Sequence, residues 1–408
     1  MKAGPIEVGK DSLRIGILPN SPVPRMLILT VLAVMAVIST YVAVKEGAFS
    51  DSATEAIDFQ WSGSHLLSQH ENPWQLYIQH KDQGKIILGQ QPNYLAELFL
   101  ILLPLGRMSF PVAAVWWCGL NLAFAAGILY AVRRMFSLDR DHTLLVTFLL
   151  MASMPFRVTL HNGQHGLFIL LMLCLTFLPR NLLLKGLALG VSYSKYSFAP
   201  LIVMMLIVKR RLGIVLISVI PPLVGLLIAW HMLGGSLLSL AQEPFDVAKM
   251  AMGPGMADIM TPLEFLLRRL SVEPSLIFSL PAALGMLAAA ISAIWIGRSK
   301  RMTEELQFAV ALVLTLICLK HVNYDFVVLV VPVAAAVMAP RSKARAIVLL
   351  CALHFWFLTP IIGHVFSAQR VYVLEVVIYG LLLLAMAIAT SRLYPTIEAD
   401  AGLVPASE

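Results

Sequence analysis

Residues 26–44 read MLILTVLAVMAVISTYVAV and contain no charged side chain. An α-helix rises about 1.5 Å per residue, so roughly 20 apolar residues cross the hydrocarbon core of a bilayer, which is about 30 Å thick. The run follows a tail, residues 1–25, that contains four Lys or Arg residues and lacks the pattern of a cleavable signal. We therefore expect a retained transmembrane helix whose preceding tail is cytoplasmic.

The composition of the whole chain extends this expectation. The 408 residues are 59% apolar and only 13% charged, with a mean hydropathy of +0.82. These values exclude a soluble protein and, with apolar runs of helix length, predict an all-α integral membrane protein. The apolar share is enough for about twelve spans of roughly 20 residues. The net charge of +7 arises largely from short loops between apolar runs, which argues against nucleic acid as a partner.

Eleven further apolar stretches are predicted to be transmembrane helices. They cover residues 111–131, 143–156, 164–178, 182–194, 196–208, 212–232, 276–297, 305–320, 324–339, 344–361 and 371–391. Loops assigned to the cytoplasm contain fourteen Lys and Arg residues, against four in the short loops opposite. This bias predicts that both termini, including the tail 392–408, are cytoplasmic. We expect one polytopic helical domain, residues 1–408.

Two loops on the outer side are long, residues 45–110 and 233–275. The apolar stretch 94–105 is too short for a span and is expected to lie at the interface or to re-enter the membrane. The second loop is rich in Pro and is predicted to be a loop followed by a short amphipathic helix at 263–270. The first loop is predicted to form interfacial helices with aromatic anchors. Its apolar residues are Ile57, Phe59, Trp61, Leu66, Leu67, Trp74, Leu76 and Tyr77.

Polar residues gather at the predicted outer ends of the helices, which is informative because polar groups are costly at membrane depth. For any single histidine, a helix-end residue at the lipid headgroups is the ordinary alternative. Eight of the ten histidines fall on this side: His65, His70, His80, His161, His165, His231, His321 and His364. The residues that accompany them are Arg157, Asn162, Gln164, Tyr193, Lys195, Asn323, Tyr324 and Asp325.

Asp58 is a carboxylate between the apolar residues Ile57 and Phe59, directly after the first helix. Such neighbours require contact with membrane or protein, and partial burial would raise the pKa of Asp58 toward that of a usable general base. Taken alone, Asp58 is more simply interpreted as a surface residue or a helix cap than as a catalytic base. Its place in a long outer loop favours the catalytic interpretation.

Five short motifs follow one another on this outer side. Asp58-Phe59 opens the first loop, and Gln91-Pro92-Asn93-Tyr94 precedes the next apolar stretch. The later motifs are Asn162-Gly163-Gln164-His165, Lys195-Tyr196, and His321-Val322-Asn323-Tyr324 before Val331-Pro332. Their order resembles that of glycosyltransferase family 87, whose motifs are Asp-Phe, Tyr-Pro-Pro, Gly-Gln, Lys-Pro and His-Tyr. This chain departs from the family at Tyr-Pro-Pro and at the proline after the lysine.

The resemblance implies a GT-C fold and a membrane glycosyltransferase that uses a polyprenyl-phosphate-linked sugar such as mannose. It implies inversion at the anomeric carbon, with Asp58 as the general base. His321 and Lys195 would face the donor phosphate. The expected partners are this donor, a glycolipid or glycan acceptor and membrane lipids, at the extracytoplasmic face of a bacterial cytoplasmic membrane. No cofactor is expected.

Other residues are candidates for substrate binding. Arg268 and Arg269 break the positive-inside pattern, and adjacent positions on a helix point about 100° apart, so one of the two is expected at the phosphate site and the other at lipid headgroups. A headgroup role for both is the alternative. The remaining candidates, which lie at the same face, are Gln164, His161, His165, Asn323 and Tyr324.

Metal ligation is not expected. His161 and His165 have i, i+4 spacing, but Gly163 between them disfavours a continuous helix. The four cysteines occur singly within or beside apolar stretches, without the close pairs of a zinc site, and are predicted to be packing residues. They are Cys118, Cys174, Cys318 and Cys351.

Two alternatives stand beside the transferase. About twelve spans also suit a transporter or lipid flippase, although such proteins usually show half-to-half similarity and ionisable residues near mid-membrane. A noncatalytic scaffold of the cell envelope would show the same pattern of motifs.

Overall fold

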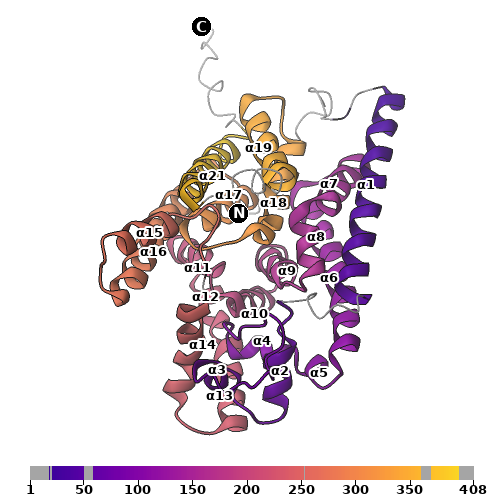
Figure 1. The fold of residues 1–408 in the computed structure, drawn as a ribbon. Coiled ribbons are helices and arrows are strands. Elements are labelled where there is room, and N and C mark those ends of the chain that lie inside the picture. Colours follow the sequence, from indigo (N-terminus) through magenta and orange to yellow (C-terminus); the bar gives the residue numbers. More distant parts are fainter. Residues whose placement is uncertain (1–17, 19–20, 50–57, 252, 360–368, 395–408) are drawn as a thin grey trace.

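The computed structural model describes residues 18, 21–49, 58–251, 253–359 and 369–394, and every regular element in these ranges is helical (Figure 1). The all-α prediction is confirmed for this part of the chain. The elements up to the middle of the chain are α1 (Pro22–Phe49), α2 (Trp61–Ser68), α3 (Pro73–Ile78), α4 (Ala96–Ile101), α5 (Leu103–Gly106), α6 (Phe110–Phe136), α7 (Arg140–Ala152), α8 (Met154–His161), α9 (Gly166–Phe177), α10 (Leu182–Ser192), η1 (Tyr193–Lys195) and α11 (Ala199–Val208). The later elements are α12 (Leu212–Ser218), α13 (Ile220–Leu233), α14 (Leu237–Ala251), α15 (Met260–Arg269), α16 (Pro274–Arg298), α17 (Glu304–Cys318), η2 (Asn323–Leu329), α18 (Val330–Met338), α19 (Lys343–Leu353), the π-helical turn η3 (His354–Leu358) and α21 (Gln369–Thr390). Most of the two tails, and Ile57, lie outside the described residues.

Five helices in the described part are long and apolar enough to cross a membrane: α1, α6, the pair α12–α13, α16 and α21. The bent pair α7–α8 makes a sixth if it is one span. The chain is therefore an integral membrane protein. Each of the other predicted segments also contains a helix, but helices such as α9 and α11 have only 12 and 10 residues. The number of about twelve crossings stays a prediction.

The predicted span 143–156 is helical, but it is bent rather than one straight helix. The helix α7 stops at Ala152, and α8 continues to His161 after a bend of 57°. Ser153 lies between them in extended conformation, and its Oγ accepts a hydrogen bond from the backbone N–H of Phe156. Pro155, in the first turn of α8, has no backbone N–H and cannot continue the helical hydrogen bonds of α7. The chain therefore bends here.

The first outer loop folds into α2, α3, α4 and α5, but the prediction of aromatic membrane anchors is wrong for Phe59 and Trp74. Phe59, Leu67 and Trp74 are fully buried, because they face protein rather than lipid. The Trp74 indole N–H donates to the Tyr94 carbonyl at 3.2 Å, and its ring lies 5.3 Å from that of Phe99 in α4. The apolar faces of these short helices therefore pack on one another. Their position at the membrane surface stays a prediction.

The stretch 94–105 is divided between α4 and α5, which break at Leu102. Helix α4 packs against α13, and a Cβ added to Gly225 would come 2.7 Å from the Cβ of Glu97. The absence of a side chain at Gly225 therefore lets the two helices touch. Glu97 is buried at this contact, and burial raises its pKa to about 7.

The second outer loop contains more helix than the sequence predicted. Residues 237–251 form α14, with Pro244 inside the helix, where a loop was expected. Glu243 beside the proline accepts hydrogen bonds from Asn72 at 2.8 Å and from Gln75 at 2.7 Å, which join α14 to the beginning of α3. These side-chain bonds help hold a helix that local sequence disfavours. The short helix predicted at 263–270 is present as α15.

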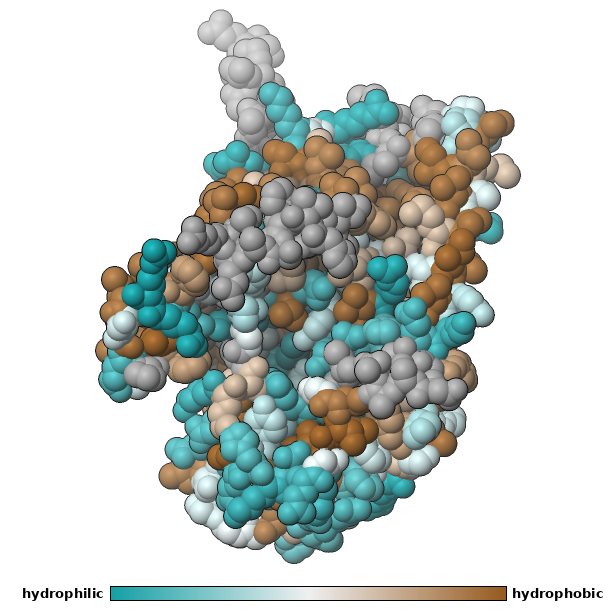
Figure 2. Space-filling model, in the orientation of Figure 1, coloured by the Kyte–Doolittle hydropathy of each residue, from teal (hydrophilic) through white to brown (hydrophobic). Residues whose placement is uncertain are grey.

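The interior is centred on α17, whose residues from Leu306 to Leu316 are all buried. A helix that is apolar on all sides suits such a central position. The outer helices expose apolar side chains, as α1 does along most of its length. Figure 2 shows this apolar surface along α1 and a hydrophilic surface over the region of α2 and α3.

Candidate active site

Asp58 is held by the turn between α8 and α9. Its backbone N–H donates to the Asn162 carbonyl at 3.0 Å, and its carboxylate Oδ2 accepts from the side-chain amide of Gln164. Gly163 between them has φ +65°, and a Cβ there would come 2.6 Å from the Cβ of Phe59. Glycine is therefore required at this position, both for the left-handed backbone and for the close approach of the Asp58 segment.

Aromatic rings support this turn from behind. The Trp117 indole N–H donates to the Gly163 carbonyl at 2.8 Å, and its ring stacks on Phe59 at 5.3 Å with 7° between the planes. Phe59 is fully buried, and Asp58 beside it is partly buried. Phe59, the apolar neighbour that lies within the described residues, thus anchors the Asp58 carboxylate through its contact with Trp117.

Burial raises the pKa of Asp58 to about 6, because desolvation disfavours the carboxylate. The positive charge of Lys195 opposes this shift, and the negative charge of Asp325 adds to it. A carboxylate with this pKa is ionised at pH 7 and yet basic enough to accept a proton from a reacting hydroxyl.

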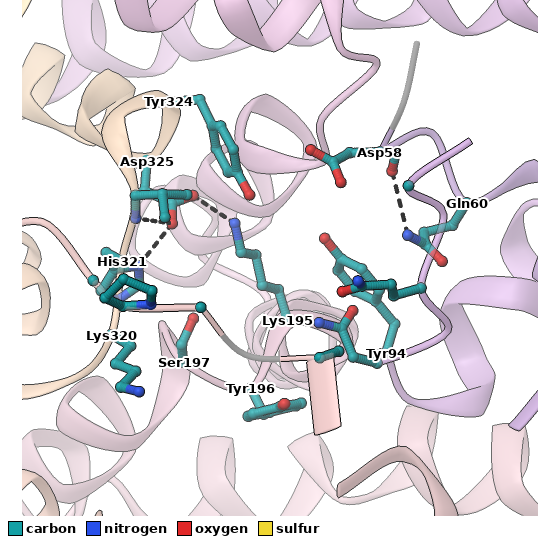
Figure 3. Close-up of a pocket in the computed structure, with 18 residues that line it drawn as sticks. Asp58, Gln60, Tyr94, Lys195, Tyr196, Ser197, Lys320, His321, Tyr324 and Asp325 are labelled. Atoms are coloured by element: carbon teal, nitrogen blue, oxygen red, sulfur yellow. Dashed lines mark hydrogen bonds and ion pairs between the residues drawn. The ribbon is translucent and has the colours of Figure 1, made fainter. Parts of the chain in front are cut away.

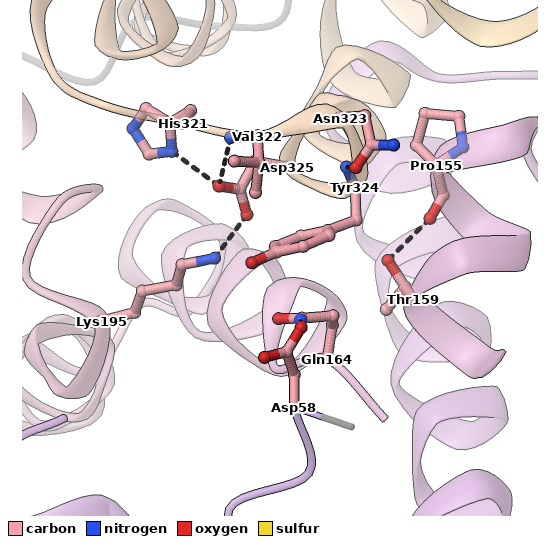
Figure 4. A network of polar contacts seen from close by, with 10 residues as sticks. All are labelled: Asp58, Pro155, Thr159, Gln164, Lys195, His321, Val322, Asn323, Tyr324 and Asp325. Atoms are coloured by element: carbon pink, nitrogen blue, oxygen red, sulfur yellow. Dashed lines mark hydrogen bonds and ion pairs between the residues drawn. The ribbon is translucent and has the colours of Figure 1, made fainter. Parts of the chain in front are cut away.

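A second polar cluster lies where η1 and η2 meet. Lys195 Nζ contacts Asp325 Oδ1 at 2.5 Å, and His321 Nδ1 contacts Asp325 Oδ2 at 3.0 Å. The Lys195 ammonium also lies 4.9 Å from the centre of the Tyr324 ring, a cation–π distance. Figure 4 shows the Tyr324 ring between this cluster and the Asp58–Gln164 pair. Segments separated by more than a hundred residues therefore meet at one place.

A cavity of ≈ 190 Å³ separates Asp58 from this cluster (Figure 3). Asp58, Gln60 and Tyr94 line one side, and Lys195 and His321 line the other. The remaining lining residues are Gly89, Gln91, Asn93, Tyr196, Ser197, Ala251, Gly253, Pro254, Gly255, Lys320, Val322, Tyr324 and Asp325. The cavity thus places a basic carboxylate opposite cationic groups, with amide and hydroxyl side chains between them.

The family model of glycosyltransferase family 87 matches residues 98–320, more than half of the chain. The chain belongs to glycosyltransferase family 87. It is therefore a membrane-bound transferase, and its polytopic helical structure is consistent with a GT-C fold. No curated protein and no solved structure matches the chain.

Five of the predicted site residues of the transferase come together. Asp58, Lys195, His321 and Tyr324 line the cavity, and Gln164 touches Asp58 from behind. These residues were predicted from motifs alone, and their roles stay predictions.

Other predicted residues of the transferase lie apart from the cavity lining. His161 faces α1, where its Nδ1 lies 3.3 Å from the Glu46 carboxylate. Asn323 accepts a hydrogen bond from the Tyr324 backbone and directs its amide to Met154. Their positions favour structural roles at the ends of α8 and η2.

His165 is buried between aromatic rings rather than open to the cavity. Its ring lies 5.1 Å from Tyr94 and 4.9 Å from Trp117. Neither ring nitrogen has a hydrogen-bond partner among the described residues. The i, i+4 pair of His161 and His165 is divided because Gly163 breaks the helix, and the described residues contain no group of three or more His, Cys, Asp or Glu arranged to hold a metal ion.

Arg268 and Arg269 are both exposed on α15, and neither lines the cavity. The Arg268 guanidinium lies 5.6 Å from the centre of the Phe278 ring in α16. The structure therefore does not bring either arginine to Asp58, and the headgroup alternative fits their exposure better than the phosphate site.

Two charged groups at the cavity of the transferase were not singled out from the sequence as site residues. Asp325 follows His321 at i+4, and an acid at the start of an apolar helix was the signal for it. Lys320 lines the cavity and forms a buried ion pair of 2.7 Å with Glu264 in α15. That contact joins positions far apart in sequence, so no local pattern indicates it.

Proposed function

We propose that the transferase moves a sugar from a polyprenyl-phosphate donor to a hydroxyl group of a glycolipid or glycan, with inversion. The observation that carries this proposal is the placement of Asp58 across the cavity from Lys195 and His321. A hexose such as mannose is the proposed sugar. The reaction takes place at the extracytoplasmic face of a bacterial cytoplasmic membrane.

Asp58 is the proposed general base. Its raised pKa of about 6 suits proton transfer near neutral pH, and the Gln164 amide holds one carboxylate oxygen, Oδ2, by a hydrogen bond. The acceptor hydroxyl loses its proton to Asp58 as its oxygen attacks the anomeric carbon.

Lys195 and His321 are the proposed partners of the donor phosphate. When the bond between the anomeric carbon and the phosphate oxygen breaks, the electron pair stays on the phosphate. Preorganised cationic and hydrogen-bonding groups stabilise such a charge, most strongly where water is excluded. Lys195 and His321 are largely buried, with side-chain exposures of 13% and 1%.

The carboxylates at the cavity favour a single displacement. Asp58 and Asp325 are the acidic residues that line it within the described part of the chain, and Asp325 is occupied by Lys195 and His321. Retention by double displacement would require a nucleophile in addition to the base, whereas the Asp58 carboxylate alone is enough for direct attack with inversion.

The placement at the extracytoplasmic face rests on α1. This helix is long enough to cross the membrane once, and Asp58 follows it closely in sequence. The basic tail before α1 and the excess of Lys and Arg in alternate loops support a cytoplasmic N-terminus, which puts Asp58 on the opposite side.

The proposal is tested by transfer of radiolabelled mannose from synthetic polyprenyl-phosphate mannose to a membrane-lipid extract by the purified protein. Asp58→Ala and Asp58→Asn are expected to abolish product while both variants remain folded in the membrane. Asp246→Asn is the control, because Asp246 lies on α14 in an exposed ion pair with Lys249 and outside the cavity. Transfer retained by both Asp58 variants would contradict the role of Asp58 as the general base. A wild-type protein that forms no product would contradict polyprenyl-phosphate mannose as the donor.

A further inference from the structure

Asp325 divides its carboxylate between the two groups proposed to face the donor phosphate. Oδ1 accepts from Lys195 at 2.5 Å, and Oδ2 accepts from His321 at 3.0 Å. Resting on the function proposed above, we propose that Asp325 is a positioning residue for the transfer. It sets the place and orientation of Lys195 and His321 for the departing phosphate and does not itself bind it.

Lys195, His321 and Asp325 depend on one another, because each is a largely buried polar side chain that needs a partner. The Asp325 side chain is 2% exposed, and a carboxylate buried to this degree requires hydrogen-bonding or charged partners. Lys195 and His321 supply them from two different segments of the chain, one in η1 and one before η2. The backbone N–H of Val322 adds a weaker contact of 3.4 Å to Oδ2.

Lys195 can bind a phosphate without leaving Asp325. A lysine ammonium has three N–H donors, and one is directed to Asp325 Oδ1. The ammonium lies over the rings of Tyr324 and Phe198, at 4.9 and 5.3 Å from their centres, and it lines the cavity. The contact with Asp325 thus fixes the ammonium at the wall while other donors stay directed away from that carboxylate.

His321 is oriented in the same way. Its Nδ1 is occupied by Asp325, and its ring lies 4.3 Å from that of Phe198. Nε2 has no hydrogen-bond partner among the described residues. Because the Asp325 contact and the ring contact fix the imidazole, Nε2 is the atom left for a phosphate oxygen.

Because Asp325 is negatively charged, its effect on the position of Lys195 and His321 can be distinguished experimentally from an effect on donor binding. A carboxylate near the donor repels its phosphate, so Asp325 does not increase donor affinity directly. Asparagine preserves the shape but cannot accept from both partners through two carboxylate oxygens. Asp325→Asn is therefore expected to lower kcat while the KM for the donor stays unchanged or falls. A merely structural defect would raise KM or reduce the amount of folded protein.

The test is a kinetic comparison with polyprenyl-phosphate mannose as the varied substrate. Asp325→Asn is expected to lower kcat by about 10²-fold, as for a misplaced catalytic group. Asp139→Asn is the control, because Asp139 also accepts from a backbone N–H and from a histidine Nδ1, at 2.9 and 2.8 Å from His142, and lies outside the cavity. The control is expected to keep the wild-type kcat.

A double variant tests whether Asp325 acts through Lys195. The loss of kcat in Lys195→Met/Asp325→Asn is expected to exceed that of Lys195→Met but to be smaller than the product of the two single losses. If Asp325→Asn does not fold alone, the double variant, which has no unpaired lysine charge, is compared with Lys195→Met. Equal kcat for these two would overturn the part of the proposal in which Asp325 orients His321, because Asp325 would then act through Lys195 alone.

The outcomes separate this proposal from the proposed function. An active wild-type protein with an unaffected Asp325→Asn variant, or with fully multiplicative losses, overturns the positioning role alone. A wild-type protein that transfers nothing from this donor overturns both.

Discussion

The side-chain amide of Gln164 donates a hydrogen bond to the carboxylate of Asp58, from a position 106 residues later in the chain. The bond fixes the rotation of the carboxylate and stabilises its ionised form. Burial acts in the opposite direction and raises the pKa of Asp58. The pKa of Asp58 therefore depends on burial, which raises it, on the positive charge of Lys195, which lowers it, and on the negative charge of Asp325, which raises it.

The pH dependence of transfer follows from the pKa of Asp58. The base must be ionised to accept a proton, and its pKa is about 6. We expect kcat/KM to rise tenfold per pH unit below about pH 6 and to level off above it. Initial rates between pH 4.5 and 8.5 at low donor concentration measure this, and a flat profile across that range would contradict the role of Asp58.

Asp58→Asn is expected to stabilise the inactive protein at alkaline pH. The pKa of Asp58 is about 6 in the folded protein and near 3.8 when unperturbed, so the folded state binds the proton more tightly. The stability associated with this proton is present below the unperturbed pKa and is lost as the pH rises through 6. An amide avoids the loss, and the gain at pH 8 is on the order of 3 kcal/mol.

The measurement is thermal unfolding of both proteins in detergent at pH 4 and pH 8. The midpoint difference in favour of Asp58→Asn should be larger at pH 8. A difference that is the same at both pH values would show that Asp58 is not desolvated in the folded state.

Gln164→Leu removes the amide donor and keeps a side chain of similar size. The ionised form of Asp58 loses its hydrogen bond, so the acidic limb of the pH–rate profile should move to higher pH. Loss of a hydrogen bond to a charged group costs about 1.5–3 kcal/mol, which corresponds to a fall in kcat/KM of roughly tenfold or more at pH 6. A fall in rate without any movement of the acidic limb would mean that Gln164 acts on substrate rather than on Asp58.

Gly225→Ala should destabilise the contact between α4 and α13. The added Cβ would lie 2.7 to 2.8 Å from the backbone and Cβ of Glu97, so the helices must separate, at a cost of about 1–3 kcal/mol. Gly119→Ala is the control, because a Cβ there meets no atom within 4 Å on the exposed side of α6. The unfolding midpoint should fall for Gly225→Ala and stay or rise for Gly119→Ala; equal midpoints would refute the close packing.

The sequence predicts helices better than it predicts their contacts. Uncharged runs such as 26–44 indicate helix directly, because the bilayer requires internal hydrogen bonds. The helix around Pro244, in contrast, depends on tertiary hydrogen bonds, those of Glu243 to Asn72 and Gln75. Local patterns contain no information about partners so distant in the chain.

The same limit applies to the candidate site. Asp58, Lys195 and His321 were found because short motifs mark them. His165 was predicted at the same site, but in the structure its ring packs against Tyr94 and Trp117 instead. The sequence does not show which way this side chain points, because that depends on the local backbone turn. The place of Asp325 at the site could not be predicted from its own motif, because it depends on contact with Lys195, 130 positions away in the chain.

The Lys195–Asp325 ion pair also constrains how the protein is made. The two residues are separated by 130 positions, and a ribosome adds about 5–20 residues per second. Lys195 therefore leaves the ribosome roughly 6 to 26 s before the carboxylate that neutralises it. During that interval the nascent chain holds an uncompensated lysine between apolar helices. The helices α10 and α11 are therefore synthesised before this ion pair can form.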